Sequence, residues 1–101
     1  MTDLLTQEMF EHRLGEAFHI ALADSNERLT LELFTVQQLG GSTSETSKRK
    51  PFALYFRGGP RDRFLPQRIY RLDHAELGPL EIFLVPLGPD EVAMRYEAIF
   101  T

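Results

Sequence analysis

The C-terminal 25 residues constrain the fold of this chain more than any other stretch. Residues 77–101 read LGPLEIFLVPLGPDEVAMRYEAIFT. Two runs rich in β-branched, aliphatic and aromatic residues, 80–87 and 93–100, flank the turn-forming tetrad Gly88-Pro89-Asp90-Glu91. Such runs, separated by Gly, Pro and Asp, predict a β-hairpin. We therefore expect the residues upstream to wrap around this hairpin.

The N-terminal residues 5–15 predict one short helix. Thr6 suits the N-cap position, and Phe10 and Leu14 are four residues apart and share one face. Gly15 follows as a suitable stop. Because two or three helical turns are marginal alone, we expect this helix to cap one end of a sheet. The alternative is an amphipathic helix that binds a partner.

After Gly15 the apolar pattern changes to a period of two, which indicates strands. In the second of these strands the alternation slips near Leu33-Phe34, which predicts either a β-bulge or burial of both faces. The connections are too short for βαβ crossovers, so neighbouring strands should be antiparallel. The predicted strands before the C-terminal hairpin cover residues 17–22, 28–36, 51–56 and 68–74.

These elements predict a mainly β fold, in which a short N-terminal helix accompanies about six antiparallel strands that form a small barrel or a strongly bent sheet. At 101 residues the chain has room for one domain, so we expect residues 1–101 to form a single domain. Residues 39–50, LGGSTSETSKRK, combine Gly, Ser and Thr with a basic run. This composition predicts a flexible loop.

The composition also excludes several classes of protein. The chain contains no cysteine, which excludes disulfides, thiol catalysis and thiolate zinc sites and fits a reducing compartment. No apolar stretch approaches the ~18–20 residues of a membrane helix. The N-terminus lacks the basic and apolar regions of a secretory signal. We therefore expect a cytoplasmic protein without membrane association.

Positive charge is concentrated in the middle of the chain. The net charge is −4, yet residues 48–71 hold eight of the eleven Lys and Arg residues against one acidic residue, Asp62, so this segment carries +7 and the remainder −11. Such asymmetry predicts a surface with one basic side that attracts an anionic partner. Alternatively, the strand arginines pair with acidic residues and merely solvate one face. The candidate residues for binding an anion or an acidic partner are Lys48, Arg49, Lys50, Arg57, Arg61, Arg63, Arg68 and Arg71.

Side chains suited to catalysis or metal binding are sparse. His12, His19 and His74 are scattered along the chain and do not form a zinc-binding pattern. His74 beside Asp73 could be half of an acid–base pair, but no Ser or Cys nucleophile lies in a recognisable motif. The acidic net charge and the absence of Trp argue against specific nucleic-acid binding. We predict no catalytic residue, no metal site and no cofactor.

Four stretches also resemble a known group of proteins. The helix spacing TxxxFxxxxG, the strand PFxLxFRG, the segment LPQxxYRLDH and the ending LGPLEIFLVPLGP…MRYEAIFT resemble a family of small bacterial single-domain proteins of about this length, whose function is uncharacterised. The ending is the most specific part. The chain departs from such proteins at Thr101, where they tend to have Asn, and at Arg68-Ile69, where a Gly often precedes the Tyr. The resemblance implies an accessory or structural role near phage-tail-like genes and assigns no residue a role.

These observations favour a non-enzymatic protein-interaction or assembly module. Its basic segment, or an open strand edge near residues 39–50, would contact a protein partner. The alternative is a small-molecule-binding or flavin-type barrel with oxidoreductase activity. That function requires a large apolar pocket with convergent polar groups, so the packing of the barrel interior discriminates between the two.

Overall fold

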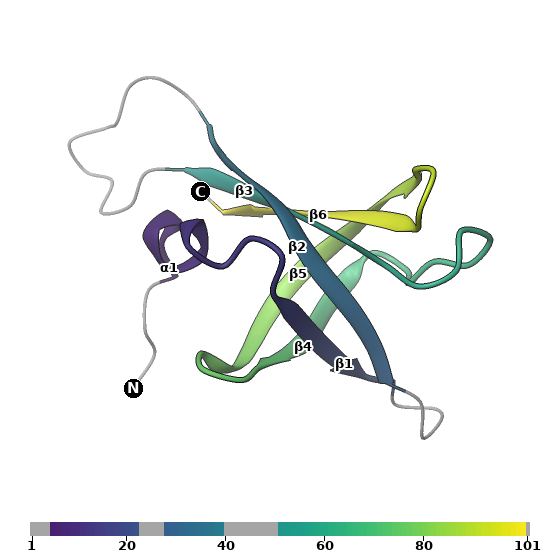
Figure 1. The fold of residues 1–101 in the computed structure, drawn as a ribbon, viewed down its shortest axis with the longest axis horizontal. Helices are drawn as coiled ribbons and strands as arrows, with labels where there is room; N and C mark the ends of the chain where they lie inside the picture. The colour runs from purple at the N-terminus through teal and green to yellow at the C-terminus, as the bar shows by residue number, and fades with distance from the viewer. Residues whose placement is uncertain (1–4, 23–27, 40–50, 101) are drawn as a thin grey trace.

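The computed structural model describes residues 5–22, 28–39 and 51–100, and β-strands dominate it (Figure 1). The strands close into one barrel in the order β1-β2-β3-β6-β5-β4, and all neighbours are antiparallel. The predicted mainly β fold is confirmed, and a closed barrel is the form it takes. The elements are α1 (Gln7–Glu11), β1 (Ala17–Ala21), β2 (Arg28–Gln38), β3 (Phe52–Gly58), β4 (Arg68–His74), β5 (Gly78–Pro89) and β6 (Met94–Phe100).

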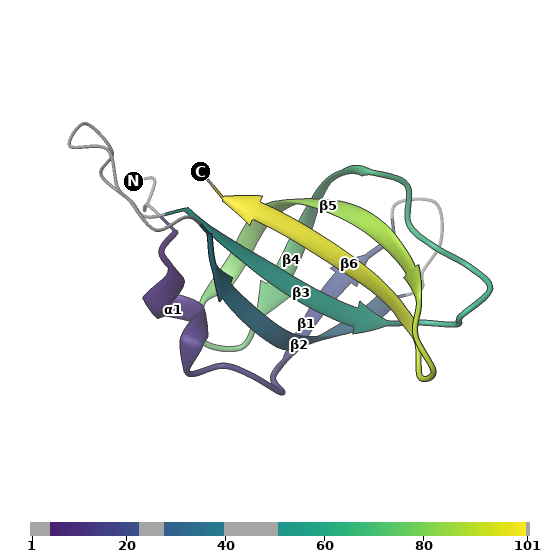
Figure 2. The ribbon, with the colours of Figure 1, turned by 90° about the horizontal axis from the view of Figure 1, so that it is seen from above.

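Two three-stranded meanders make up the barrel (Figure 2). One consists of β1, β2 and β3, the other of β4, β5 and β6, and they meet at two seams, β3–β6 and β1–β4. The β3–β6 seam contains seven residue pairs. The β1–β4 seam contains only two, His19 with Asp73 and Ile20 with Leu72. A long seam and a short seam therefore close the barrel.

Strand β2 contains the irregularity that its apolar pattern predicts. The pairing with β3 shifts between Leu33 and Thr35, so Phe34 is the extra residue of a β-bulge. Beyond the bulge, Val36 lies opposite the fully buried Leu54 and packs against the core. The bulge, and not burial of both faces, explains why the alternation slips.

Side chains fill the barrel interior. Alternate residues along each strand point inward, and a residue from α1 joins them. Small barrels of this kind fill themselves with side chains, and the aromatic residues bury the largest areas. The largest fully buried side chains are those of Tyr96, Phe10, Phe18, Phe52, Phe56, Ile20, Leu31, Leu33, Leu54, Leu72, Ile82 and Leu84.

Helix α1 covers one end of the barrel, as expected (Figures 1 and 2). Its Phe10 side chain is fully buried, and the centroid of the ring lies 6.2–6.4 Å from the ring centroids of Phe18, Phe52 and Phe100. Rings at such distances attract one another beyond the area they bury. Among the described residues, no helix has the length and apolar character that a membrane span requires.

The helix is shorter than the predicted 5–15. Thr6 is the N-cap, but the helix ends at Glu11. Leu14 lies beyond it and is 54% exposed, so it does not share a helix face with Phe10. Gly15 adopts a φ of +86° in the following turn, so the prediction that it ends the helix was wrong. The Gly15 N–H donates to the carbonyl of Leu33 at 2.7 Å. This hydrogen bond to β2 directs the chain toward β1 instead of into further helix.

The opposite end of the barrel carries two connections, residues 59–67 between β3 and β4 and residues 90–93 between β5 and β6 (Figure 1). We call this region the loop end and define it as residues 28–29, 57–68 and 88–95. The 59–67 connection agrees with the irregular segment that separates the predicted strands. The predicted flexible loop, 39–50, lies outside the described residues except at its first position.

Candidate protein-interaction surface

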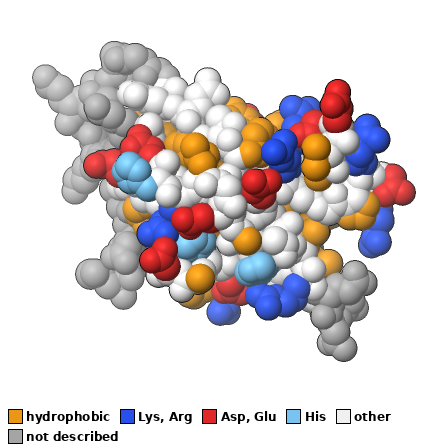
Figure 3. All heavy atoms as spheres, viewed as in Figure 1, with side chains coloured by type: hydrophobic (Ala, Val, Ile, Leu, Met, Phe, Trp, Pro, Cys, Tyr) orange, Lys and Arg blue, Asp and Glu red, His pale blue; other side chains and the backbone are white. Residues whose placement is uncertain are grey.

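The structure brings half of the predicted binding residues to the loop end. Figure 3 shows arginine side chains at this end among acidic and hydrophobic ones. Arg71 lies farther along β4, and its Nε is 3.4 Å from Asp73 Oδ1, as the solvating alternative predicts. Lys48, Arg49 and Lys50 lie outside the described residues. The four predicted residues at the loop end are Arg57, Arg61, Arg63 and Arg68.

Arg57 is held by contacts on three sides. Its Nε lies 3.5 Å from Glu32 Oε1, and its Nη1 lies 3.4 Å from Asp90 Oδ2. Its guanidinium also lies 4.9 Å from the centroid of the Phe34 ring, a cation–π contact. These contacts neutralise the cation locally and place it beside Arg95, its cross-strand partner on β6. Arg57 therefore stabilises the structure of the loop end, and its charge is less available to a binding partner than that of an arginine without an ion pair.

Asp90 connects the two loops of this end. Its Oδ1 accepts hydrogen bonds from the N–H groups of Val92 and Ala93 at 2.7 and 2.8 Å. These backbone hydrogen bonds, followed by the contact with Arg57, lower the pKa of the Asp90 carboxyl. The Nε of Arg61 donates to the Asp90 carbonyl at 2.7 Å, so the 59–67 connection is fastened to the β5–β6 turn.

Two further features fix the 59–67 connection on the barrel. The Leu65 N–H donates to the hydroxyl of Tyr96 at 2.9 Å, and burial raises the pKa of this tyrosine. At the other end of the connection, a Cβ on Gly58 would lie 2.2 Å from the carbonyl oxygen of Thr30. Only glycine permits this close approach of β3 to β2. The connection is therefore positioned by the barrel at both of its ends.

A pocket of about 110 Å³ opens at the loop end. Most of its lining is apolar and comes from the start of β2, the end of β3 and the 59–67 connection. Arg28 and Arg63 lie among these apolar residues, and no described residue forms an ion pair with either. The residues that line this loop-end pocket are Leu22, Arg28, Leu29, Gly58, Gly59, Pro60, Arg63, Phe64, Leu65 and Tyr96.

Arg28 was absent from the predicted set because it precedes the basic segment by 20 residues. Barrel closure brings the start of β2 next to the end of β3, and so Arg28 joins Arg63. The one signal available in the sequence was the position of Arg28 at the first residue of a predicted strand.

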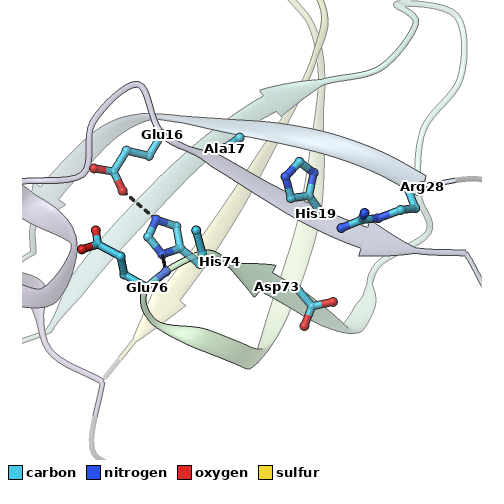
Figure 4. A pocket seen from close by; sticks show the side chains of 8 residues that line it. Glu16, Ala17, His19, Arg28, Asp73, His74 and Glu76 are labelled. Atoms are coloured by element: carbon cyan, nitrogen blue, oxygen red, sulfur yellow. Dashed lines mark hydrogen bonds and ion pairs between the residues drawn. The ribbon is translucent and has the colours of Figure 1, made fainter.

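A second pocket, of about 590 Å³, lies along the short β1–β4 seam (Figure 4). It is shallow and open. Figure 4 shows Glu16 and Glu76 near His74 at one end of the groove, with His19, Arg28 and Asp73 farther along it. Its lining consists of Glu16, Ala17, His19, Arg28, Asp73, His74, Ala75 and Glu76.

His74 is buried beneath this groove with both ring nitrogens engaged. Its Nδ1 accepts hydrogen bonds from the backbone N–H groups of Glu76 and Leu77, at 3.0 and 3.1 Å. The proton therefore resides on Nε2, which donates to Glu16 Oε1 at 2.6 Å. This hydrogen bond, ahead of the contacts with Arg13, lowers the pKa of Glu16. The arrangement joins the β4–β5 turn to the segment before β1.

The structure does not bring His74 and Asp73 together as the acid–base pair that their adjacency in the sequence allowed. Successive strand residues point to opposite faces, and Asp73 instead contacts Arg71 while His74 contacts Glu16. Since a proton-transferring group needs a free position toward its substrate, the engaged ring of His74 is a structural element. Among the described residues, no group of three His, Asp or Glu side chains could hold a metal ion.

Comparisons with known proteins bear on the family only. Searches of the curated proteins and of the solved structures found no match. The model of one family, a domain of unknown function designated DUF6916, matches residues 5–100. This match covers nearly the whole chain, in agreement with a small single-domain family of uncharacterised function. The chain therefore belongs to the DUF6916 family.

Proposed function

We propose that this chain is a non-enzymatic protein-interaction or assembly module that binds an acidic surface of a protein partner through its loop end. The observation that carries the proposal is that the loop end combines exposed apolar side chains with arginines that form no ion pair with any described residue. Phe64 is 63% exposed and Val92 is 69% exposed. They accompany Arg28 and Arg63, which have no ion-pair partner in the described part of the chain.

The balance of charge at the loop end supports an acidic partner. Six arginines lie in residues 28–29, 57–68 and 88–95, against three acidic residues, Asp62, Asp90 and Glu91. Asp90 is already engaged by two backbone N–H groups. Interfaces are enriched in Arg and aromatic residues, and loops held by a rigid scaffold are the usual place for binding residues.

The wider setting follows from the resemblance described above. That resemblance implies an accessory or structural role near phage-tail-like genes, which supports a partner within a larger protein assembly. The cysteine-free composition supports a cytoplasmic location.

Two alternatives receive less support. The described side chains fill the barrel interior, and the two pockets described above open at the surface, so a ligand-binding or flavin-type barrel has no described internal site. For contact through a strand edge, β2 and β3 would need unpaired residues near 40–50. They remain paired as far as Gln38 and Phe52.

The test is affinity capture from a native bacterial lysate, with bound proteins and bound small molecules identified by mass spectrometry. We expect the wild-type chain to capture a stoichiometric protein that high salt releases, because exposed charge pairs are screened by salt. The double variant Arg61→Glu with Arg63→Glu should lose this protein. Arg71→Glu is the matched control, because it reverses an exposed charge on β4 away from the loop end.

Unfolding curves should first establish that all variants are folded. Equal capture by the wild type and the double variant would overturn the proposal. A co-purifying cofactor without a protein partner would also overturn it and favour the ligand-binding barrel.

A further inference from the structure

We infer that the loop-end pocket receives one aliphatic side chain of the partner, and that carboxylates flanking this side chain pair with Arg28 and Arg63. This inference rests on the proposed function and names the chemistry that the loop end recognises. Its occupant is a short protein segment in which an aliphatic residue stands between acidic residues.

The size of the pocket selects an aliphatic side chain. The volume is about 110 Å³, smaller than the ~150 Å³ apolar cavity that accommodates benzene in a well-studied case. One Leu, Ile or Val side chain fits such a space, whereas an indole ring does not. Side chains that fill well-packed, desolvated pockets near the centre of an interface contribute most of its binding energy.

The walls of the pocket are suited to such an anchor. Leu22, Leu29 and Leu65 are half-buried, and Phe64 adds an exposed ring. The hydroxyl oxygen of Tyr96 accepts a hydrogen bond from the Leu65 N–H, so the backbone of the 59–67 connection already uses this polar atom. Burying an aliphatic group here removes apolar surface from water on both partners.

The rim of the pocket supplies the charge complementarity. Arg28 and Arg63 approach it from different elements, the start of β2 and the 59–67 connection. Both side chains are exposed and lack an ion pair with any described residue. A guanidinium binds a carboxylate through paired N–H donors. Acidic residues on either side of the anchor would therefore meet one arginine each.

The experiment uses a tryptophan reporter. The chain contains no Trp, so Phe64→Trp places a single indole at the edge of the pocket. Three short capped peptides are titrated into this variant: one with Leu between aspartates, one with Ser in place of Leu, and one with Asn in place of both Asp residues.

We expect the Leu-Asp peptide to shift the Trp emission to shorter wavelength in a saturable manner, within the millimolar range. The Ser peptide should bind at least about tenfold more weakly, because the buried aliphatic group is lost. The Asn peptide should lose both affinity and salt dependence. Adding Leu22→Phe, which occupies the pocket, should reduce the affinity of the Leu-Asp peptide to that of the Ser peptide.

Two outcomes would overturn the inference. One is the absence of a saturable shift with the Leu-Asp peptide up to several millimolar. The other is equal binding of the Leu and Ser peptides, which would mean that charge alone is recognised. In both cases, salt-sensitive capture that depends on Arg61 and Arg63 would still uphold the proposed function. Capture that is unchanged when both arginines are replaced by Glu would overturn the proposed function itself.

Discussion

The two ends of the barrel differ in how their side chains are used. At the helix end, Phe10 packs among three other aromatic rings and His74 uses both ring nitrogens. At the loop end, Arg28 and Arg63 have no ion pair with any described residue, and Phe64 is exposed. At the helix end these side chains are used in contacts within the chain. At the loop end the arginines and the exposed ring remain available to contact a partner. Substitutions at the two ends should therefore separate stability from binding.

The largest expected effect is that of Phe10→Ala at the helix end. Removing this fully buried ring leaves a cavity among Phe18, Phe52 and Phe100, and the free energy of unfolding should fall by about 3–5 kcal/mol. Urea denaturation followed by circular dichroism measures the change. Leu14→Ala, in the exposed turn nearby, is the control and should change it by less than about 0.5 kcal/mol. Similar values for the two variants would contradict the capping role of α1.

Gly58→Ala should affect both stability and binding. The added Cβ would lie 2.2 Å from the Thr30 carbonyl oxygen, so β2 and β3 must separate beside the pocket. Such overpacking costs about 1–3 kcal/mol. Thermal unfolding measures the cost, and the amide shifts of Thr30 and Leu31 should report the displacement. An unchanged melting temperature would show that the strands have more room than the structure indicates.

Tyr96→Phe should loosen the 59–67 connection without moving the core. The variant loses the hydrogen bond from the Leu65 N–H and should be less stable by about 0.5–1.5 kcal/mol. The Leu65 amide should exchange with solvent faster. Tyr55→Phe removes a hydroxyl that donates to Glu97 on the outer face, so it serves as the control. Equal exchange at Leu65 in both variants would contradict the role of Tyr96.

The last prediction concerns Glu16, whose contribution to stability is present at neutral pH and is lost as the pH falls. Hydrogen bonding to His74, and then to Arg13, lowers the folded-state pKa of Glu16 below its ordinary value of 4.5. A carboxyl with a lowered pKa stabilises the fold above 4.5, and this contribution disappears as the pH falls through the folded-state pKa. Wild-type stability should therefore decrease more between pH 6 and 3 than that of Glu16→Gln.

Denaturation midpoints across this pH range measure the difference for Glu16. Glu8→Gln removes a charge from an exposed helix position and controls for the altered net charge. A wild-type curve parallel to that of Glu16→Gln would show that Glu16 gains nothing from His74 in the folded state.

The strands were predictable because their pattern is local. Alternation with period two identified the first four strands, and the apolar runs on either side of a turn identified the last two. The slip at Leu33-Phe34 marked the position of the bulge. The end of the helix was not predictable, since it depends on a hydrogen bond from Gly15 to Leu33 on β2. Local propensity favoured a longer helix, and a tertiary contact prevented it.

The candidate site was predictable only in part. The basic segment pointed to Arg61 and Arg63, but the structure engages Arg57 with Glu32 and Asp90. Arg28 and Tyr96 join the loop-end pocket because the barrel closes. Glu16 and His74 meet across 58 positions of sequence. Contacts between residues so far apart in the sequence produce no periodic pattern of residue types, so one sequence alone does not reveal them.

The unequal seams have a consequence for how the barrel forms and opens. Within each meander, partners are neighbours in sequence, so their pairing closes short loops and loses little chain entropy. Both seams join distant segments, and only β1–β4 does so through two residue pairs. Separating β1 from β4 thus exposes less than any other break between strands. We therefore expect the barrel to open first between β1 and β4, before the strands within either meander separate.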